Sequence, residues 1–263
     1  MINKIIHFSD LHIRLFKDHE LYREIMLDAF NQWKKIKPDR IVFTGDLVHS
    51  KNQMTPELVE MIRWVLTECS SICKTILIPG NHDFLENNMS RLDAISPVLD
   101  ALNDSNIVYY KTRGVHQDEN IDWVVYSLYE HNIPPIIELS DRLKIGLFHG
   151  PIIGLKTDVG YEFDSGFDKN GFDGCDIVLC GDIHKRQIIY LENEQNKKIP
   201  IVQIGSTIIQ NFGEKISNHG YGVYDVKQDK YTTFDLTNKR PFLKFRITSI
   251  DDIEKNAEIL LNE

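Results

Sequence analysis

The stretch KIIHFSDLH, residues 4–12, joins a short apolar run directly to the polar pair Asp10 and His12. The same arrangement returns twice, because GDLVH at residues 45–49 and GNHD at residues 80–83 follow two further apolar runs. Short apolar runs that end in glycine or polar residues are typical of buried strands. The first half of the chain is therefore expected to contain three strands that each end in polar side chains.

Helical patterns separate these expected strands. Residues 19–36 place apolar side chains about three to four residues apart, which is typical of an amphipathic helix. Thr55 and Pro56 have the residue types preferred at the N-cap and the first position of a second helix. A third helical stretch is expected after Ser90, with an interruption at Ser96-Pro97. This alternation of strands and helices is typical of an α/β fold.

The second half of the chain is richer in strand patterns. Two of its apolar runs end in polar clusters of the same kind, FHG at residues 148–150 and GDIH at residues 181–184. The stretch between them is rich in Gly and Asp and has little periodicity, as in functional or mobile loops. The chain is thus expected to fold as a four-layer α/β sandwich of two mixed β-sheets flanked by helices, built from two related halves. Strands are expected here at residues 107–110, 123–127, 144–148, 176–180, 187–191, 201–204, 222–226 and 231–236.

Composition places the chain among soluble globular proteins. Its 263 residues are enough for a sizeable core, and 42% hydrophobic and 26% charged residues are ordinary values for that class. The N-terminal stretch lacks the apolar segment and small-residue cleavage site of a signal peptide. No apolar run approaches the roughly 18 residues that indicate a membrane span. We therefore expect a cytosolic protein with no membrane partner.

Net charge and cysteine content say less about function. A formal net charge of −9 gives no overall attraction for nucleic acid, but bound divalent cations would cancel several acidic groups within a site. Cys69, Cys73, Cys175 and Cys180 have spacings that do not suit a zinc site, and each lies among apolar residues. Reduced thiols in the core are the expected state of all four.

The five polar clusters together indicate a metal site. The carboxyl ends of strands in α/β sheets form the crevice where ligands bind, so clusters that follow these strands are expected to converge. Imidazole and carboxylate groups favour manganese, iron or zinc, and an Asn amide oxygen is a harder ligand. Two metals about 3.5–4 Å apart would hold a bridging hydroxide and polarise a phosphoryl oxygen. A single Asp-x-His cluster is more often a plain turn than a ligand pair, and only the ordered set of five indicates this chemistry.

In this order, from Asp10 to His184, the clusters resemble those of the calcineurin-like metallophosphoesterase superfamily. A narrower resemblance is to the SbcD-type nuclease subunits that act in DNA double-strand-break repair and recombination in phages and prokaryotes. It rests first on His49, which stands three residues after Asp46. It rests also on FHGP at residues 148–151, KTDVGY at residues 156–161, GST at residues 205–207 and QNFGE at residues 210–214.

The superfamily resemblance implies a site for two divalent metal ions, with manganese expected and magnesium as the alternative. It implies that Asp46 bridges the ions and that His82 protonates the leaving oxygen or steadies the transition state. His49 is expected to contact the phosphate or to orient the substrate. The unperturbed pKa of imidazole, about 6.5, suits proton transfer near neutral pH. The other implied ligands are Asp10, His12 and His184 for one ion, and Asn81, His149 and Asp182 for the second.

The nuclease resemblance implies metal-dependent hydrolysis of phosphodiester bonds in DNA, as an exonuclease and a single-strand endonuclease. Its expected partners are DNA, a coiled-coil ATPase subunit of the SbcC type and a second copy of the chain in a homodimer. The expected place is the cytoplasm, which is the host cytoplasm for a phage protein. Residues 1–240 would form the nuclease domain, and residues 241–263 the start of a truncated or minimal capping domain.

Two other functions stay open at this point. One is a phosphomonoesterase or cyclic-nucleotide phosphodiesterase of the same fold, because one fold and metal site can serve many substrates. The second is a non-catalytic scaffold subunit that binds DNA ends. The nuclease-like stretches favour the DNA nuclease over the first alternative, and the near-complete set of ligands favours it over the second.

Asp182 departs from the family pattern, which has His at this position. We expect its carboxylate to replace that His as a ligand, because carboxylate oxygen suits the same ions. By charge counting, the inner shell of two metals would then sum to about zero instead of about +1. The site is therefore expected to attract phosphodiester anions less strongly and to favour manganese or magnesium over zinc. The histidines that match no ligand position, and are expected to have ordinary surface or core roles, are His7, His19, His116, His131 and His219.

Overall fold

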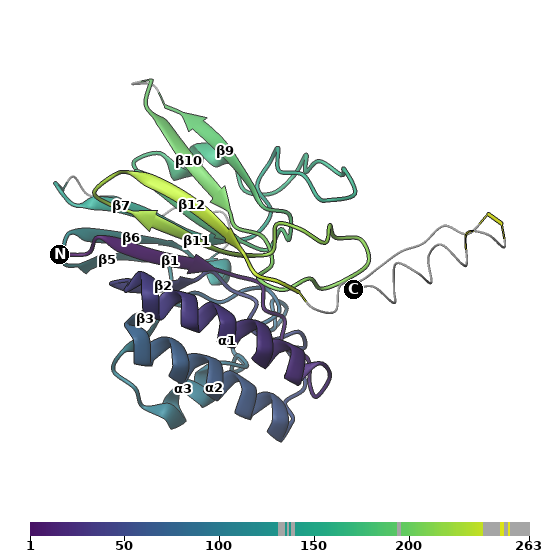
Figure 1. Ribbon diagram of the computed structural model, residues 1–263. Coiled ribbons are helices and arrows are strands. Elements are labelled where there is room, and N and C mark those ends of the chain that lie inside the picture. Colours follow the sequence, from purple (N-terminus) through teal and green to yellow (C-terminus); the bar gives the residue numbers. More distant parts are fainter. Residues whose placement is uncertain are drawn as a thin grey trace.

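Two six-stranded β-sheets stack face to face at the centre of the molecule (Figure 1). The computed structural model describes residues 1–130, 135, 137, 140–193, 196–238, 248, 249 and 252. The first sheet consists of β1 (Lys4–Phe8), β2 (Arg40–Phe43), β3 (Lys74–Leu77), β4 (Ile107–Tyr109), β11 (Gly220–Asp225) and β12 (Lys230–Asp235). The second consists of β5 (Gly114–Asp118), β6 (Ile121–Tyr126), β7 (Leu143–His149), β8 (Ile177–Gly181), β9 (Gln187–Glu192) and β10 (Lys198–Gln203).

Each sheet has a parallel centre with antiparallel strands beside it. The first sheet has the order β12-β11-β1-β2-β3-β4, in which β1 to β4 run parallel and β11 and β12 join antiparallel. The second has the order β5-β6-β7-β8-β10-β9, in which β6, β7, β8 and β10 run parallel between antiparallel β5 and β9. The carboxyl ends of the parallel strands therefore share one edge in each sheet, where ligand sites form in such folds. The repeated arrangement confirms the expected sandwich of two mixed sheets.

Apolar side chains from both sheets form the core between them. Ile5, Val42 and Ile76 of the first sheet belong to the same buried cluster as Trp123 and Leu179 of the second, and all five are fully buried. Complete burial of one such side chain contributes about 1.5–3 kcal/mol. This core fixes the two sheets relative to each other, and with them the strand ends that carry the polar clusters.

Three α-helices cover the outer face of the first sheet (Figure 1). They are α1 (His19–Ile36), α2 (Pro56–Ile72) and α3 (Ser96–Leu102). Trp33 of α1 packs against Phe8 of β1, with ring centroids 5.0 Å apart. The expected helices at residues 19–36 and from Thr55 onward are therefore confirmed by α1 and α2.

The outer face of the second sheet is covered in a different way. Within the described residues, the segment 151–172 lies over it and contains one short 3₁₀ helix, η2 (Lys169–Phe172). Ile152 is fully buried, and Phe167 packs on Phe148 of β7 with ring centroids 4.9 Å apart. The sequence suggested flanking helices on both faces, but on this face apolar side chains of an irregular segment bury the sheet instead. A further 3₁₀ turn, η1 (Leu128–Glu130), follows β6.

The structure corrects two local expectations. Pro97 does not interrupt a helix, because α3 begins at the preceding Ser96, where proline fits the first turn. The side chain of Asp93 accepts hydrogen bonds from the backbone N–H groups of Ile95 and Ser96 at 3.0 and 2.7 Å and so supports this start. Strand β5 was not expected, since its sequence GVHQD is largely polar, and it forms by antiparallel pairing with β6.

Several further expectations have separate outcomes. Cys69, Cys73, Cys175 and Cys180 are free thiols, three of them buried and Cys73 half-buried, which confirms the expected state. The strand-like run at residues 242–247 and the helix at residues 250–261 lie outside the described residues, apart from residue 252. The division into residues 1–240 and 241–263 therefore stays a prediction. No helix in the described part of the chain is long and apolar enough to cross a membrane.

Candidate metal centre

The polar clusters of both halves meet at one edge of the sandwich. Asp10, Asp46 and Asn81 follow β1, β2 and β3, while His149 and Asp182 lie at the ends of β7 and β8. The backbone N–H of Asp182 donates to both carboxylate oxygens of Asp10 at 3.1 Å, which joins the second half to the first. The same edge holds the remaining candidates, which are His12, His49, His82 and His184.

A first group of ligand-type atoms comes from Asp10, His12 and His184. The Nε2 atoms of the two imidazoles are 2.9 Å apart, and each lies 3.8 Å from Asp10 Oδ1. His184 donates its Nδ1–H to Glu214 at 2.7 Å, so its Nε2 points toward the group. Burial opposes the charged form of His184, but the hydrogen bond with Glu214 and the Asp10 carboxylate outweigh burial and raise its pKa to about 9. Two imidazole nitrogens and a carboxylate that converge in this way suit a metal cation, which would take the place of the proton.

A second group comes from Asp10, Asp46 and His149. His149 donates its Nδ1–H to the carbonyl oxygen of Thr44 at 2.6 Å, which leaves Nε2 for another partner. That Nε2 lies 3.4 Å from Asp46 Oδ2 and 3.4 Å from Asn81 Oδ1. Burial opposes the charged form of this imidazole, but the Asp46 and Asp10 carboxylates outweigh burial and raise the pKa of His149. Only acceptor atoms surround Nε2 in this group, so a second divalent cation would take the place of its proton.

Asp46 stands between the two groups. Its Oδ2 lies 3.4 Å from Nε2 of both His12 and His149, and its Oδ1 accepts a hydrogen bond from the backbone N–H of His82 at 2.8 Å. Burial opposes the charged form of this carboxyl, but the neighbouring His149 outweighs burial and lowers its pKa. A charged oxygen equidistant from one imidazole of each group has the position that a bridging ligand requires.

The electrostatics of the cluster also suit metal ions. Burial, with a further contribution from the Asp46 carboxylate, raises the pKa of Asp10 to about 6. Burial raises the pKa of Asp182 and lowers that of His12. His12 is therefore held neutral, with a lone pair available, while the carboxylates are held close together at a cost. Divalent cations would offset that cost directly.

His82 and His49 lie beside the two groups. The imidazole of His82 meets that of His12 edge to face, with centroids 4.7 Å apart, and stacks on that of His49 at 5.8 Å. His82 donates Nδ1–H to the carbonyl oxygen of His49 at 2.9 Å, which fixes the ring and leaves Nε2 for another partner. His49 is exposed. The pair is thus placed at the open side of the cluster.

Asp182 lies next to the second group but outside it. Its Oδ1 is 3.8 Å from Nε2 of His149, and its side chain is 17% exposed. Its backbone has φ +91°, a left-handed conformation that residues other than glycine rarely adopt. The expected ligand is therefore within reach of the second position and is the least enclosed of the carboxylates there.

The backbone of this edge is strained where it carries the ligands. Asp10, His12 and Asp46 have φ values of +53°, +48° and +60°, and such residues persist only when the surrounding structure holds them. Close packing provides that hold. A Cβ atom on Gly45 would meet Nδ1 of His149 and the backbone of Gly80. These glycines let the strand ends approach closely enough for their neighbours to share one site.

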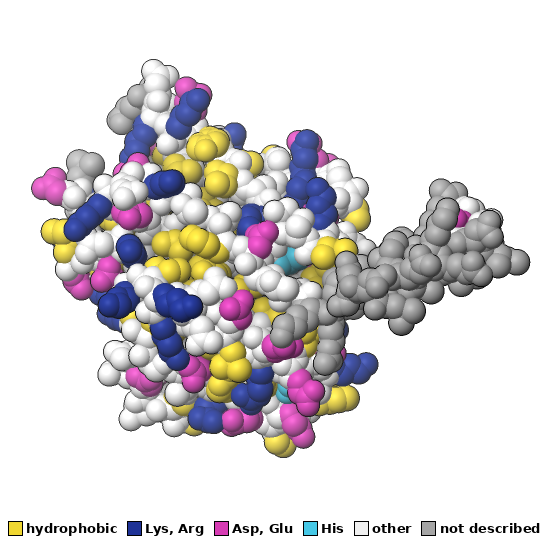
Figure 2. Space-filling model, viewed as in Figure 1, with side chains coloured by type: hydrophobic (Ala, Val, Ile, Leu, Met, Phe, Trp, Pro, Cys, Tyr) yellow, Lys and Arg dark blue, Asp and Glu magenta, His cyan; other side chains and the backbone are white. Residues whose placement is uncertain are grey.

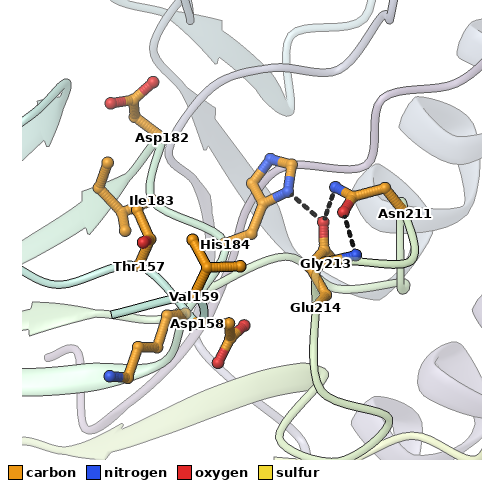
Figure 3. A pocket seen from close by; sticks show the side chains of 10 residues that line it. Thr157, Asp158, Val159, Asp182, Ile183, His184, Asn211, Gly213 and Glu214 are labelled. Carbon is orange, nitrogen blue, oxygen red and sulfur yellow. Dashed lines mark hydrogen bonds and ion pairs between the residues drawn. The ribbon is translucent and has the colours of Figure 1, made fainter. Parts of the chain in front are cut away.

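Two carboxylates that support the site had no role assigned from the sequence. Asp83 is fully buried and accepts hydrogen bonds from the backbone N–H groups of Asp46, Leu47 and Gly80 at 2.8–2.9 Å. Burial, and then the Asp46 carboxylate, raise its pKa to about 7. Its place in the GNHD stretch was the available signal. Glu214, from the QNFGE stretch, holds His184 (Figure 3).

Four other histidines have partners that explain them without a metal. Three of them donate or accept hydrogen bonds: His7 with Tyr231 and Thr44, His19 with the carbonyl of Arg14, and His219 with Ser206 and the carbonyl of Lys215. The fourth, His116, stacks on Tyr110 with centroids 3.9 Å apart. His131 lies outside the described residues.

The family model for calcineurin-like phosphoesterases matches residues 3–186, a span that includes all nine candidate residues. The chain belongs to the calcineurin-like phosphoesterase family. It is thus a hydrolase of this family, and its Asp and His cluster fits two divalent metal ions.

Individual proteins also resemble the chain. Uncharacterised protein R555 of Acanthamoeba polyphaga mimivirus is 31% identical over 268 residues, which cover 96% of this chain and 19% of that protein. The chain thus spans about a fifth of the length of this relative. A crystal structure of a dimetal phosphatase from Danio rerio matches with a TM-score of 0.53 at 10% identity, over 92% of this chain and 98% of that one. This second likeness shows the shared fold.

Replacing Gly80 by alanine tests the close packing of the strand ends. A Cβ at this position would overlap the carboxylate and the backbone nitrogen of Asp46. We expect Gly80→Ala to lose stability by about 1–3 kcal/mol through overpacking and to lose Mn²⁺ binding in calorimetric titration. Gly160→Ala is the control, because its Cβ would meet nothing within 4 Å and only backbone strain is added. Normal Mn²⁺ binding by Gly80→Ala would contradict this packing argument.

Substitutions of Asp182 test its place at the second metal position. Asp182→Ala is expected to weaken one of two Mn²⁺ binding steps by about 10-fold or more, because one ligand is removed. Asp182→His is expected to keep both steps, since imidazole serves the same ions. Asp158→Ala is the control, because Asp158 lines the same cavity. Isothermal titration with Mn²⁺ in the absence of substrate measures each step, and undiminished two-step binding by Asp182→Ala would exclude the ligand role.

Proposed function

We propose that this chain is a metal-dependent DNA nuclease that hydrolyses phosphodiester bonds. In this proposal, the candidate ligands from both sheets have the roles expected from the sequence. Asp10, His12 and His184 would hold one ion, Asn81, His149 and Asp182 the other, and Asp46 both. When bound, two divalent cations supply a nucleophile by lowering the pKa of water and stabilise charge on the phosphoryl oxygens.

The observation that carries the choice of a diester is a pair of cavities, one beside a residue of each group of candidate ligands. Asp182 lines both. One cavity, of about 250 Å³, lies beside His184 (Figure 3), and the other, of about 350 Å³, lies beside His149 and Asn81. A phosphomonoester has one organic substituent, whereas a phosphodiester has one on each side of phosphorus. Space beside each group of ligands therefore favours a diester substrate.

His82 and His49 would perform the protein's part of the reaction. With Nδ1–H donated to the carbonyl oxygen of His49, the His82 imidazolium would donate its second proton from Nε2 to the departing oxygen. The exposed His49 ring, stacked on His82, is positioned to contact a phosphate oxygen. His82 and His49 would thus act on the substrate and not on a metal. These roles explain why both histidines lie beside the candidate ligands but outside the buried carboxylate cluster.

The charge distribution favours binding at the site itself over a broad basic surface. On the face seen in Figure 2, Lys and Arg side chains are interspersed with Asp and Glu. Lys185 lines the cavity beside His184 and forms no ion pair within the part of the chain that the structure describes. Lys156, by contrast, pairs with Glu162 at 3.1 Å. Lys185 is therefore a cation that is positioned to contact a phosphate further along a bound strand.

The resemblance to SbcD-type nucleases supports two wider proposals. One is a role in DNA double-strand-break repair or recombination. The second is assembly with a coiled-coil ATPase subunit, with two copies of the chain in the complex. Co-purification of the chain with such an ATPase, followed by light scattering, would test the assembly independently of nuclease activity.

A comparison of substrates tests the proposed activity. With Mn²⁺, we expect cleavage of end-labelled single-stranded and duplex DNA, and faster hydrolysis of bis-p-nitrophenyl phosphate than of p-nitrophenyl phosphate. The diester fills both cavities, whereas the monoester fills one. Chelation of the metal should abolish all three activities. If DNA stays intact while the monoester is hydrolysed efficiently, the protein is a phosphomonoesterase and not a nuclease.

Replacing His82 tests whether the protein is an enzyme or a non-catalytic scaffold subunit. His82→Gln is expected to lower kcat for DNA by about 10²–10⁴-fold, the usual contribution of a general acid, with little change in KM. The loss should be much smaller for bis-p-nitrophenyl phosphate, because its leaving group departs without a proton. His116→Gln is the matched control, since this ring stacks on Tyr110 instead. Equal DNA cleavage by His82→Gln and the unaltered protein would favour the scaffold.

A further inference from the structure

Glu214 occupies a buried position directly behind a candidate metal ligand (Figure 3). Its side chain is 5% exposed, and its Oε1 accepts hydrogen bonds from His184 Nδ1 and Asn211 Nδ2, both at 2.7 Å. Its Oε2 accepts from the backbone N–H of Gln210 at 2.9 Å and from the hydroxyl of Ser206 at 3.2 Å. The carboxylate is thus held in one orientation, with one oxygen facing the imidazole.

His184 belongs to one group of candidate ligands and His149 to the other, and the two imidazoles donate to different kinds of acceptor. His184 donates to the negatively charged Glu214, whereas His149 donates to the neutral carbonyl oxygen of Thr44. Hydrogen bonds to a charged acceptor are stronger, and a carboxylate behind a histidine makes the far ring nitrogen a better donor to a metal. Among the described residues, His184 of the first position therefore has a charged support that His149 of the second lacks, whereas Nδ1 of His12 has no hydrogen-bond partner.

The segment that carries Glu214 also contacts the stretch of chain that bears the other ligands of the first position. The side chain of Gln210 donates to the carbonyl oxygen of Leu11 at 3.0 Å, and Arg14 donates to the carbonyl oxygen of Gln210 at 3.1 Å. Leu11 and Arg14 flank His12 on either side. Residues 210–214 thus connect the strand end that bears Asp10 and His12 with the strand end that bears His184.

We propose that Glu214 is a positioning residue that makes the two metal positions unequal, so that the ion at Asp10, His12 and His184 is bound more tightly. This inference rests on the metal centre of the proposed function, but not on DNA as the substrate. Glu214 orients His184, strengthens its Nε2 as a ligand, and links occupancy of the first position to the conformation of residues 210–214. Asn211 and Gly213 of that segment line the cavity beside His184, so the same link reaches the substrate side.

The substitution Glu214→Gln removes the charge while keeping the size and shape of the side chain. Mn²⁺ titration by calorimetry, without substrate, is expected to show two binding steps for the unaltered protein. In Glu214→Gln the tighter step should weaken by about 10–100-fold, the usual effect of removing such a supporting carboxylate. The second step should change little. His184→Ala identifies which step belongs to the first position, because it removes the ligand that Glu214 supports.

Two further variants separate positioning from plain structural support. Asn211→Ala removes a hydrogen bond to the same Glu214 oxygen but leaves the charge, so both Mn²⁺ steps should stay close to those of the unaltered protein. Glu214→Asp keeps the charge on a shorter side chain and should recover part of the tight step. Thermal unfolding of each variant with a chelator present reports the stability of the metal-free protein.

The outcomes decide the inference. Selective loss of the tight step in Glu214→Gln, with partial recovery in Glu214→Asp, supports it. Two Mn²⁺ binding steps that are unchanged in Glu214→Gln would overturn the inference. It would also be overturned if both steps weakened equally and the metal-free variant unfolded at a lower temperature than the unaltered protein. If the unaltered protein binds two Mn²⁺ ions as described but leaves DNA intact, the substrate proposal fails and the inference about Glu214 stands. Absence of any Mn²⁺ binding by the unaltered protein would overturn both.

Discussion

The constraint on which the rest of the structure depends is that carboxylates are buried side by side at one edge of the sandwich. Asp10 and Asp46 are at most 1% exposed, and the imidazole nitrogens of His12 and His149 turn toward the same small volume. Charges of one sign in a protein interior are costly unless opposite charge compensates them. The neighbouring carboxylates outweigh burial and raise the pKa of His149 and of His184, so these imidazoles supply part of that opposite charge without a metal. Two divalent cations would supply it in their place, which fits these residues as a metal centre.

The surrounding protein holds this unfavourable arrangement in place. Asp83 fixes the backbone of the turn after β2 by accepting its N–H groups, and Gly45 and Gly80 let that turn lie against the neighbouring strand end. The left-handed backbone of several ligands adds about 1–3 kcal/mol of strain each. The apolar core between the sheets and the helices on the first sheet stabilise the fold enough to offset it.

The two sides of the centre are chemically different. The side of His184 has a charged support in Glu214 and a cavity that includes Lys185. The side of His149 has a carbonyl support and a cavity lined by the rings of Phe148 and Phe167. If the proposed phosphodiester binds here, such asymmetry would let the site distinguish its two ends.

The sequence by itself determined the features that depend on nearby residues. The helices α1 and α2, most strands and the five polar clusters follow from short patterns, because periodicity, capping residues and strand ends are local properties. The order of the clusters was enough to place nine residues at one edge of an α/β sandwich. Parallel strands bring their carboxyl ends together whatever the loops between them do.

Only the tertiary structure decided the features that arise from contacts between distant segments. Strand β5 is polar and exists because β6 pairs with it, and the outer face of the second sheet is covered by residues 151–172, which have no periodicity. The hydrogen bond from His184 to Glu214 joins residues 30 positions apart. No local pattern encodes that partner, because the segment around Glu214 takes its shape from the residues it touches. The candidate metal ligands were thus visible in the sequence, whereas the groups that hold them in place became visible only in the fold.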